Sequence, residues 1–263
     1  MQLTLATWNV NSIKSRLHQL LPWLKETAPD VVLLQELKTV GETFPYMEIE
    51  ELGYNIVLKG QKSYNGVAIL SKYPLDDARL ELPIDNGVDE EARYVEAVVS
   101  VAGKAVRVAS VYVPNGQSPD SEKFVYKLAF FKRLYAHMQT LLGYEEMFVL
   151  GGDFNVAPYP IDVFDPVRSE GKICYHPLER ECIHAILHGG MYDAFRILHP
   201  EEQHFSWWDY RTSGYADNQG LRIDYLLLSP MAADRLAHAE ILHRMRGQER
   251  PSDHAPVICT LEL

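Results

Sequence analysis

The stretch Met147-Phe148-Val149-Leu150-Gly151-Gly152-Asp153-Phe154-Asn155 decides how the rest of this sequence is interpreted. Its apolar first half is typical of a buried β-strand, and the strand ends in a carboxylate and an amide. Catalytic groups often lie where a rigid strand runs out into a loop. We therefore expect Asp153 and Asn155 to belong to a functional site.

The same arrangement occurs four more times along the chain. Apolar segments lead to carboxylate, amide or histidine side chains at Trp8-Asn9-Val10-Asn11, Leu34-Gln35-Glu36, Ile223-Asp224 and Ser252-Asp253-His254. Asp and Asn also favour turns for purely structural reasons, so one such motif alone indicates little. Five of them, each rich in oxygen ligands, favour a shared catalytic or metal site.

The pattern of apolar residues predicts an α/β fold. Strands are expected at residues 3–9, 31–36, 66–71, 106–112, 147–152, 222–228 and 257–261. The longest helix is expected at residues 121–142, where apolar side chains recur at helical spacing. Helices alternate with a larger number of strands, which favours a layered arrangement with two sheets. No repeat or long linker divides the chain, so residues 1–263 are expected to form one domain.

Composition narrows the class of protein. The 263 residues are 47% hydrophobic and 23% charged, which is typical of a folded globular chain. No run approaches the roughly 18 apolar residues of a membrane span, and the first residues lack the layout of a secretion signal. The three cysteines show no paired framework, as expected in a reducing compartment. We expect a cytoplasmic protein without a membrane partner, and a monomer because no exposed apolar helix is obvious.

One cysteine-rich segment could suggest zinc. Cys174-Tyr175-His176 is followed by Cys182-Ile183-His184. If a helix begins near Pro177, Cys182 and His184 lie two positions apart and point to different sides. Ordinary core and surface roles are therefore favoured over a zinc site.

The formal net charge of −11 limits how the protein could bind nucleic acids. It argues against a protein that binds DNA mainly through unspecific charge, because phosphate affinity comes from clustered Lys and Arg. A nuclease remains possible, since a local basic rim can steer DNA while acidic residues hold a metal.

Eight segments spread over essentially the whole chain resemble the exonuclease III family of bacterial DNA-repair enzymes, within the endonuclease/exonuclease/phosphatase superfamily. They are Trp8-Asn9-Val10-Asn11-Ser12-Ile13, Leu34-Gln35-Glu36-Leu37-Lys38, Tyr64-Asn65-Gly66-Val67-Ala68, Tyr112-Val113-Pro114-Asn115-Gly116, Gly152-Asp153-Phe154-Asn155-Val156-Ala157-Pro158, Phe205-Ser206-Trp207-Trp208-Asp209-Tyr210-Arg211, Gly220-Leu221-Arg222-Ile223-Asp224 and Pro251-Ser252-Asp253-His254-Ala255-Pro256. The resemblance implies a four-layered α/β sandwich, with two packed mixed β-sheets flanked by helices. It also implies a Mg²⁺-dependent endonuclease that cuts double-stranded DNA 5′ of abasic sites, with 3′-to-5′ exonuclease and 3′-end trimming activity. Residues 159–175 match the family only loosely, which leaves the balance of these activities open.

The resemblance also assigns a metal site. Glu36 is the expected Mg²⁺ ligand, with Mn²⁺ as a possible substitute, because such ions prefer carboxylate oxygens. Asn9 and Asp253 are expected to complete the metal's surroundings, and Asn11 is a further candidate ligand.

Six residues are assigned to the chemistry. Asp153 is expected to orient or deprotonate the attacking water, with Asn155 beside it. His254 is expected to contact the scissile phosphate, with Asp224 fixing its ring. Whether His254 acts as a base or stabilises the phosphate is left open, with stabilisation favoured. The last two candidates, Tyr112 and Asn115, are suited as donors to the phosphate.

The aromatic segment is expected to set substrate specificity. Trp207, Leu221 and Ile223 match positions that wall a pocket for a flipped abasic sugar, and an apolar slot rejects a normal nucleotide by size. Trp208 and Arg211 are included among the expected substrate contacts. The alternative is that the aromatic residues belong to the hydrophobic core. The neighbouring Arg211 and Arg222 favour the substrate-binding interpretation over it.

Basic side chains near the strand ends are candidates for DNA-backbone contacts, which position DNA without reading its bases. The candidates are Lys14, Arg16, Lys59, Lys62, Arg244, Arg246 and Arg250. Two other functions remain open. An inositol or lipid phosphate phosphoesterase of the same superfamily would share the catalytic residues but not the aromatic segment. A catalytically inactive binding relative would be expected to lose a metal ligand or the histidine.

Overall fold

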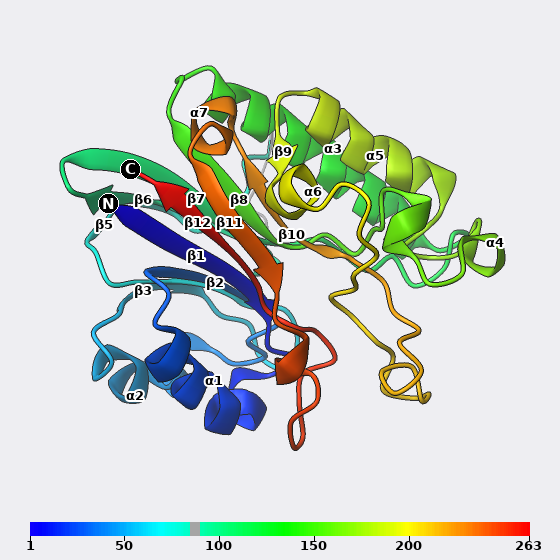
Figure 1. The fold of residues 1–263 in the computed structure, drawn as a ribbon, viewed down its shortest axis with the longest axis horizontal. Coiled ribbons are helices and arrows are strands. Elements are labelled where there is room, and N and C mark those ends of the chain that lie inside the picture. The colour runs from blue at the N-terminus through cyan, green and yellow to red at the C-terminus, as the bar shows by residue number, and fades with distance from the viewer. Residues whose placement is uncertain (85–89) are drawn as a thin grey trace.

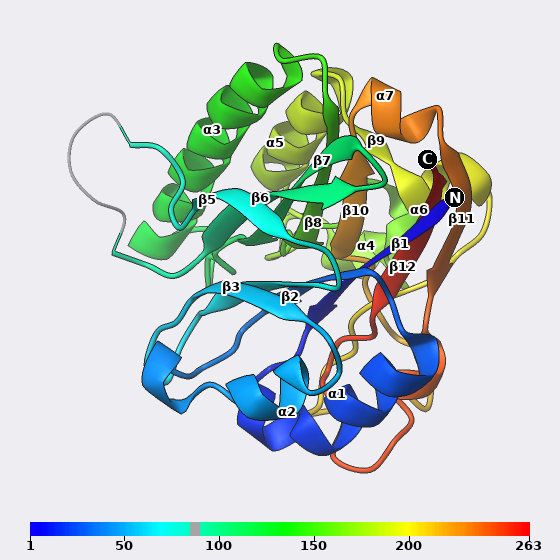
Figure 2. The same ribbon diagram turned by 90° about the vertical axis from the view of Figure 1, so that its left-hand side faces the viewer.

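The computed structural model describes residues 1–84 and 90–263. Within these ranges, two six-stranded sheets pack face to face and helices cover their outer faces (Figures 1 and 2). The predicted four-layered α/β sandwich is therefore confirmed.

The first sheet has the strand order β11-β12-β1-β2-β4-β3. Its strands are β1 (Gln2–Asn9), β2 (Val31–Gln35), β3 (Asn55–Lys59), β4 (Val67–Ser71), β11 (Leu236–Ile241) and β12 (Val257–Glu262). Strand β1 runs parallel to β2 and antiparallel to β12, so the sheet is mixed. Helices α1 (Ile13–Thr27) and α2 (Tyr46–Glu50) lie on its outer side (Figure 2).

The second sheet has the strand order β5-β6-β7-β8-β10-β9. Its strands are β5 (Leu75–Arg79), β6 (Tyr94–Val101), β7 (Lys104–Tyr112), β8 (Met147–Asp153), β9 (Tyr192–Asp193) and β10 (Asp224–Leu228). Helices α3 (Glu122–Leu142) and α5 (Pro177–His188) cover its outer face (Figure 1). The remaining elements are short: α4 (Pro166–Ser169), α6 (Ala194–Leu198), α7 (Pro230–Ala233), and 3₁₀ turns at Gly41–Thr43, Pro160–Asp162 and His243–Met245.

Alternation along the strands divides the core into layers. On β1, Leu5 faces the second sheet, whereas Trp8 belongs to the apolar cluster beneath α1. On β8, Val149 lies between the sheets and Phe148 packs beneath α3 and α5. Because successive strand side chains point to opposite faces, both sheets can be apolar on both sides.

Two glycines allow close packing just before Asp153. A Cβ atom on Gly151 would lie 2.5 Å from Leu33 Cδ1 of the facing sheet. One on Gly152 would lie 1.9 Å from the carbonyl oxygen of Val111 on β7. Larger residues at either position would push the sheets or strands apart next to the candidate site.

Most predicted elements are confirmed, with differences at their ends. Helix α3 begins directly after Ser121, whose Oγ accepts a hydrogen bond from the Phe124 amide at 3.2 Å. The strand predicted from residue 222 begins instead at Asp224, because the Arg222 amide bonds to the Asp162 carbonyl outside the sheet. Among the described residues, no helix combines the length and apolar character needed to cross a bilayer.

Candidate active site

Five polar side chains converge at one edge of the sandwich. Asn9 ends β1 and Glu36 directly follows β2, and these two strands are parallel neighbours in register. Asp153 ends β8 opposite Asp224, the first residue of β10. His254 lies just before β12, so both sheets contribute to the same site.

The convergence creates a cluster that fits a divalent cation. One ligand atom each from Glu36, Asp153 and His254 lies within 4.8 Å of the others. The Asn9 side-chain amide bridges the two carboxylates, donating to Glu36 Oε1 at 2.8 Å and to Asp153 Oδ2 at 2.9 Å. The oxygens of the two adjacent carboxylates are ligands suited to a hard cation, whereas the Asn9 oxygen accepts from the Asn11 amide at 2.9 Å.

Lys38 partly neutralises this cluster. Its ammonium lies 2.8 Å from Glu36 Oε2 and also donates to Asn11 Oδ1. Burial opposes ionisation of Glu36, but Lys38 and the Asn9 amide outweigh it and hold the Glu36 pKa below its ordinary value. Glu36 is therefore a carboxylate at neutral pH, as a metal ligand must be.

Asp224 and His254 form a buried pair. His254 Nδ1 lies 2.9 Å from Asp224 Oδ2, and its Nε2 lies 3.7 Å from Asp153 Oδ2. Burial alone would lower the His254 pKa, but the charges of Asp224 and Asp153 raise it to about 10. Burial raises the Asp153 pKa to about 7, against the lowering effect of His254. Both carboxylates favour the protonated ring, whose Nε2 is directed at Asp153, so the carboxylates of Glu36 and Asp153 rather than His254 are suited to hold a cation.

Asn155 and Asn115 extend the site beyond Asp153. Asn155 donates from Nδ2 to the Val113 carbonyl at 3.0 Å, and its Oδ1 accepts from Asn115 Nδ2 at 3.0 Å. Asn115 is exposed, and its Oδ1 accepts from the Gln117 amide at 3.2 Å. The Tyr112 hydroxyl bonds to Glu36, and burial together with the nearby carboxylates raises its pKa well above the ordinary value. Tyr112 therefore stays a neutral donor.

Three apolar side chains near His254 form what we call the wall: Trp207, Leu221 and Ile223. Trp207 makes isolated bridges with both Leu221 and His254, and Trp207 and Leu221 are half-buried. Ile223 lies beneath them and is only 2% exposed. Trp207 also donates from Nε1 to Asp253 Oδ2 at 3.0 Å, which ties the wall to the loop that carries His254.

Residues 6–254 match the model of the Endonuclease/Exonuclease/phosphatase family. The chain belongs to this family. It is 36% identical to exodeoxyribonuclease III of Haemophilus influenzae, over 95% of this chain and 97% of that protein. The exonuclease III resemblance inferred from the sequence is thereby confirmed.

Two solved structures of this family share the fold closely. The 3′ phosphatase NExo from Neisseria, solved bound to a product DNA hairpin, has a TM-score of 0.94 at 38% identity, covering 99% of this chain and 100% of that one. An AP endonuclease from Archaeoglobus fulgidus has a TM-score of 0.92 at 38% identity, with the same coverage.

The four residues expected to bind the metal do not all lie together in the structure. Glu36 and Asn9 belong to the cluster described above. Asp253 lies outside it, because its Oδ1 accepts from Asn11 Nδ2 at 2.8 Å and its Oδ2 accepts from Trp207. Asn11 bonds to Lys38 on its other side. A direct metal contact of Asp253 or Asn11 stays a prediction that requires these bonds to rearrange.

Two sequence interpretations are wrong. Trp208, expected among the substrate contacts, is fully buried and donates from Nε1 to Asn218 at 3.2 Å. Arg222, taken as support for the wall, is also fully buried and ion-paired with Asp162 and Asp193. Both tryptophans lie in a loop: Trp207 makes isolated bridges at the site, whereas the ring of Trp208 packs edge-on against Tyr215 and His243.

The expected basic rim is only partly exposed. Arg246 is 9% exposed and stacks on Tyr210 and Tyr215, so it supports the loop rather than facing solvent. Arg16 is half-buried and donates to the Tyr210 hydroxyl at 2.7 Å. Arg211 is exposed but bonds in two places to Asp209. The remaining candidates are half-buried or exposed: Lys59 is half-buried, and Lys14, Lys62, Arg244 and Arg250 are exposed.

Several supporting residues were not predicted. Ser252 donates to the Asn9 carbonyl at 2.6 Å and accepts from the His254 amide at 3.2 Å. Lys127 is fully buried and donates to the carbonyls of Asn115 and Asn155. Lys and Ser are common residues without a distinctive pattern, so only the tertiary contacts identify them.

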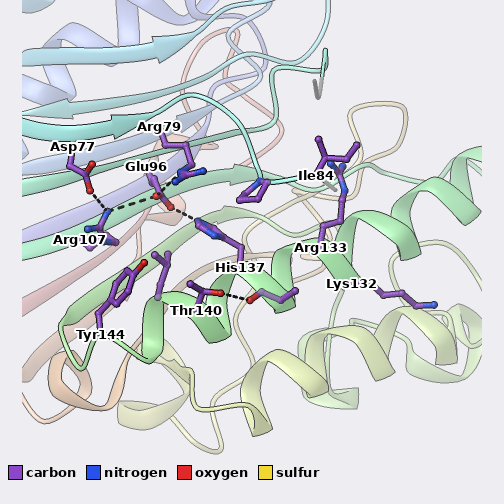
Figure 3. Close-up of a pocket in the computed structure, with 13 residues that line it drawn as sticks. Asp77, Arg79, Ile84, Glu96, Arg107, Lys132, Arg133, His137, Thr140 and Tyr144 are labelled. Atoms are coloured by element: carbon purple, nitrogen blue, oxygen red, sulfur yellow. Dashed lines mark hydrogen bonds and ion pairs between the residues drawn. The ribbon is translucent and has the colours of Figure 1, made fainter. Parts of the chain in front are cut away.

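A hollow lies between α3 and β5–β7, and several of the charged side chains that line it pair with one another (Figure 3). The buried Glu96 accepts from His137 Nε2 at 2.7 Å and pairs with Arg79 at 3.3 Å. Arg107 pairs with Asp77 at 3.1 Å. These contacts form a structural ion network, and the convergence of strand ends remains the better candidate for chemistry.

Proposed function

We propose that this chain is a Mg²⁺-dependent DNA-repair nuclease of the exonuclease III type, which cuts 5′ of abasic sites and trims 3′ ends. The observation that carries the proposal is the buried Asp224–His254 pair directed at the Glu36–Asp153 cluster, directly beside the wall of Trp207. Its relatives include exodeoxyribonuclease III and an AP endonuclease, which agrees with a hydrolase acting on DNA.

The metal would be held by Glu36, with Asn9 close by. Mg²⁺ bound there would supply charge neutralisation to the phosphate and to the leaving oxygen, and Mn²⁺ could substitute. Glu36 is ionised and partly exposed, so an ion could reach it from solvent. Lys38 would have to give up its contact with Glu36 for the ion to bind, and a flexible four-carbon side chain permits this.

The chain's own residues would carry out the proton and phosphate steps. Asp153 would orient the attacking water with Asn155 and accept its proton at a carboxylate oxygen. His254 would donate from Nε2 to a phosphate oxygen, because it is held as a cation by Asp224. This favours the role of phosphate stabiliser over that of base.

Tyr112 and Asn115 would bind the same phosphate. The Tyr112 hydroxyl bonds to Glu36 and the Asn115 amide bonds to Asn155, so each is a neutral donor next to a residue of the site. Fixed donors favour charge that develops in the transition state. Trp207 and Leu221 would receive the flipped abasic sugar, with Ile223 as the floor beneath them. Because both sheets contribute to this arrangement, we propose that residues 1–263 act as one catalytic domain. Monomeric state and cytoplasmic location stay predictions.

The test is cleavage of a labelled duplex that carries one abasic-site analogue, beside an intact duplex, with Mg²⁺ present. We expect cleavage 5′ of the analogue and shortening of the intact duplex from its 3′ ends, both abolished by EDTA. Glu36→Gln and His254→Ala should abolish both activities, whereas the exposed controls Glu42→Gln and His238→Ala should retain them. Absence of cleavage in the wild type would overturn the proposal. Hydrolysis of inositol or lipid phosphates would then become the next reaction to measure.

A further inference from the structure

Ser206 lies between the two chain segments that carry Asp224 and His254. Its backbone amide donates to the Leu221 carbonyl at 2.9 Å, and its carbonyl accepts from the Ala255 amide at 2.7 Å. One residue therefore bonds both to the segment that leads to Asp224 and to the residue that follows His254. Its neighbour Trp207 forms the wall described above.

The Ser206 hydroxyl uses all of its hydrogen-bonding capacity. It donates to Asp224 Oδ2 at 2.6 Å and accepts from the amides of Ile223 at 3.0 Å and Asp224 at 3.1 Å. The residue is fully buried, so water cannot replace these bonds without rearrangement. A serine hydroxyl offers one donor and two acceptor sites, and all three are occupied.

The oxygen that Ser206 contacts is also the closer partner of the histidine. Asp224 Oδ2 accepts from His254 Nδ1 at 2.9 Å and from Ser206 at 2.6 Å. Two donors on one oxygen, arriving from different directions, restrict rotation of the carboxylate. The direction of the carboxylate in turn fixes the ring and hence the position of Nε2, because partners of a histidine's other nitrogen set its orientation.

We propose that Ser206 is a positioning residue for the nuclease reaction, acting through Asp224 on the direction of His254. The proposal rests on the proposed function and adds a residue to it. Ser206 itself touches neither substrate nor reacting atoms. A purely structural serine would satisfy the buried amides of residues 223 and 224 without affecting the chemical step.

Ser229 provides a matched control for Ser206→Ala. It lies at the opposite end of β10, is 1% exposed, accepts from the Phe148 amide at 2.9 Å and donates to the Glu146 carbonyl at 3.1 Å. Ser206→Ala removes a buried hydroxyl that makes three hydrogen bonds beside the first residue of β10. Ser229→Ala removes a buried hydroxyl that makes two hydrogen bonds just beyond its last residue. Thermal unfolding of both variants compares their structural costs.

The first readout is steady-state kinetics on the abasic duplex with Mg²⁺. Ser206→Ala should lower kcat roughly 10- to 100-fold, as loss of an orienting partner typically does, and leave KM within about twofold. Ser229→Ala should leave kcat unchanged. A kcat for folded Ser206→Ala equal to that of Ser229→Ala, or a loss confined to KM, would overturn the proposal.

The second readout needs no activity and separates this inference from the proposed function. In the wild-type protein, proton NMR should show a low-field, slowly exchanging Nδ1 proton of His254, with a nuclear Overhauser contact to the Ser206 hydroxyl proton. In Ser206→Ala the Nδ1 resonance should move or broaden, and in Ser229→Ala it should not. Absence of this resonance in the wild type, or no change in Ser206→Ala, contradicts the positioning role. Failure of the wild type to cleave DNA contradicts only the proposed function.

Discussion

Replacing Arg222 by Met should destabilise the fold without weakening a DNA contact. Arg222 donates from Nε to Asp162 Oδ1 at 2.7 Å and from one terminal nitrogen to Asp193 Oδ2 at 2.6 Å. Methionine fills similar space but leaves both buried carboxylates without this cation. Breaking a buried ion pair by removing one partner typically costs about 3–5 kcal/mol.

The lower end of that range is expected here. Asp162 keeps a second cation, because Arg196 donates to its Oδ1 at 2.6 Å. Asp193 keeps its role as the N-cap of α6, accepting from the amides of Phe195 and Arg196. We therefore expect a loss of about 3 kcal/mol in the free energy of unfolding. With an unfolding entropy of about 2.1 cal/mol/K per residue, this lowers Tm by about 5 °C.

The assay is thermal unfolding followed by circular dichroism, with Arg168→Met as the control. The Arg168 side chain is 85% exposed, so its replacement should change stability by less than about 0.5 kcal/mol. DNA affinity measured at several salt concentrations tests the alternative role. A lost phosphate contact would reduce the slope of log Kd against log salt by about 1. An unchanged Tm together with a reduced slope would refute the assignment of Arg222 to the interior.

Two further predictions concern the metal and the histidine. Mg²⁺ at about 100 times its Kd should stabilise the wild type by about 2.7 kcal/mol and so raise its Tm. Glu36→Gln should remove this rise in Tm, whereas the exposed Glu42→Gln should keep it. Equal rises in Tm in all three proteins would contradict Glu36 as the ligand. The folded-state pKa of His254, about 10, exceeds its ordinary value of 6.5, so its stabilising contribution is complete below pH 6.5 and is lost as the pH rises towards 10. In EDTA, the decline of Tm between pH 7 and pH 10 should therefore be shallower in His254→Gln than in the wild type, and a parallel decline would contradict the charged pair.

Most strands that are apolar on both faces could be predicted from the sequence, although the largely buried β6 (Tyr94–Val101) was missed. Polar or irregular strands could not be predicted. Strands β2, β4 and β8 consist almost entirely of apolar residues and are fully buried, so local composition suffices. Strand β5, Leu75–Arg79, contains two aspartates and is mostly exposed at the edge of its sheet. Edge strands bury little apolar surface, so their pattern resembles that of a loop.

Part of the candidate site could be predicted from the sequence. Strand ends rich in carboxylates predicted Glu36, Asp153 and Asp224, and the structure places all three at one edge. Trp208 could not be separated from Trp207 in the same way. The two residues are adjacent and of the same type, and only the path of the loop in the folded chain leaves Trp207 partly exposed while it buries Trp208.

The layered α/β class, the family and the residues at the strand ends could be inferred from sequence, because these depend on short stretches of chain. Which polar groups support one another became clear only from the packing of the folded chain. Ser206 meets Asp224 across 18 positions and Arg222 meets Asp162 across 60, so no local pattern predicts either contact. Buried polar groups require hydrogen-bond partners, but the identity of the partner depends on how distant segments pack.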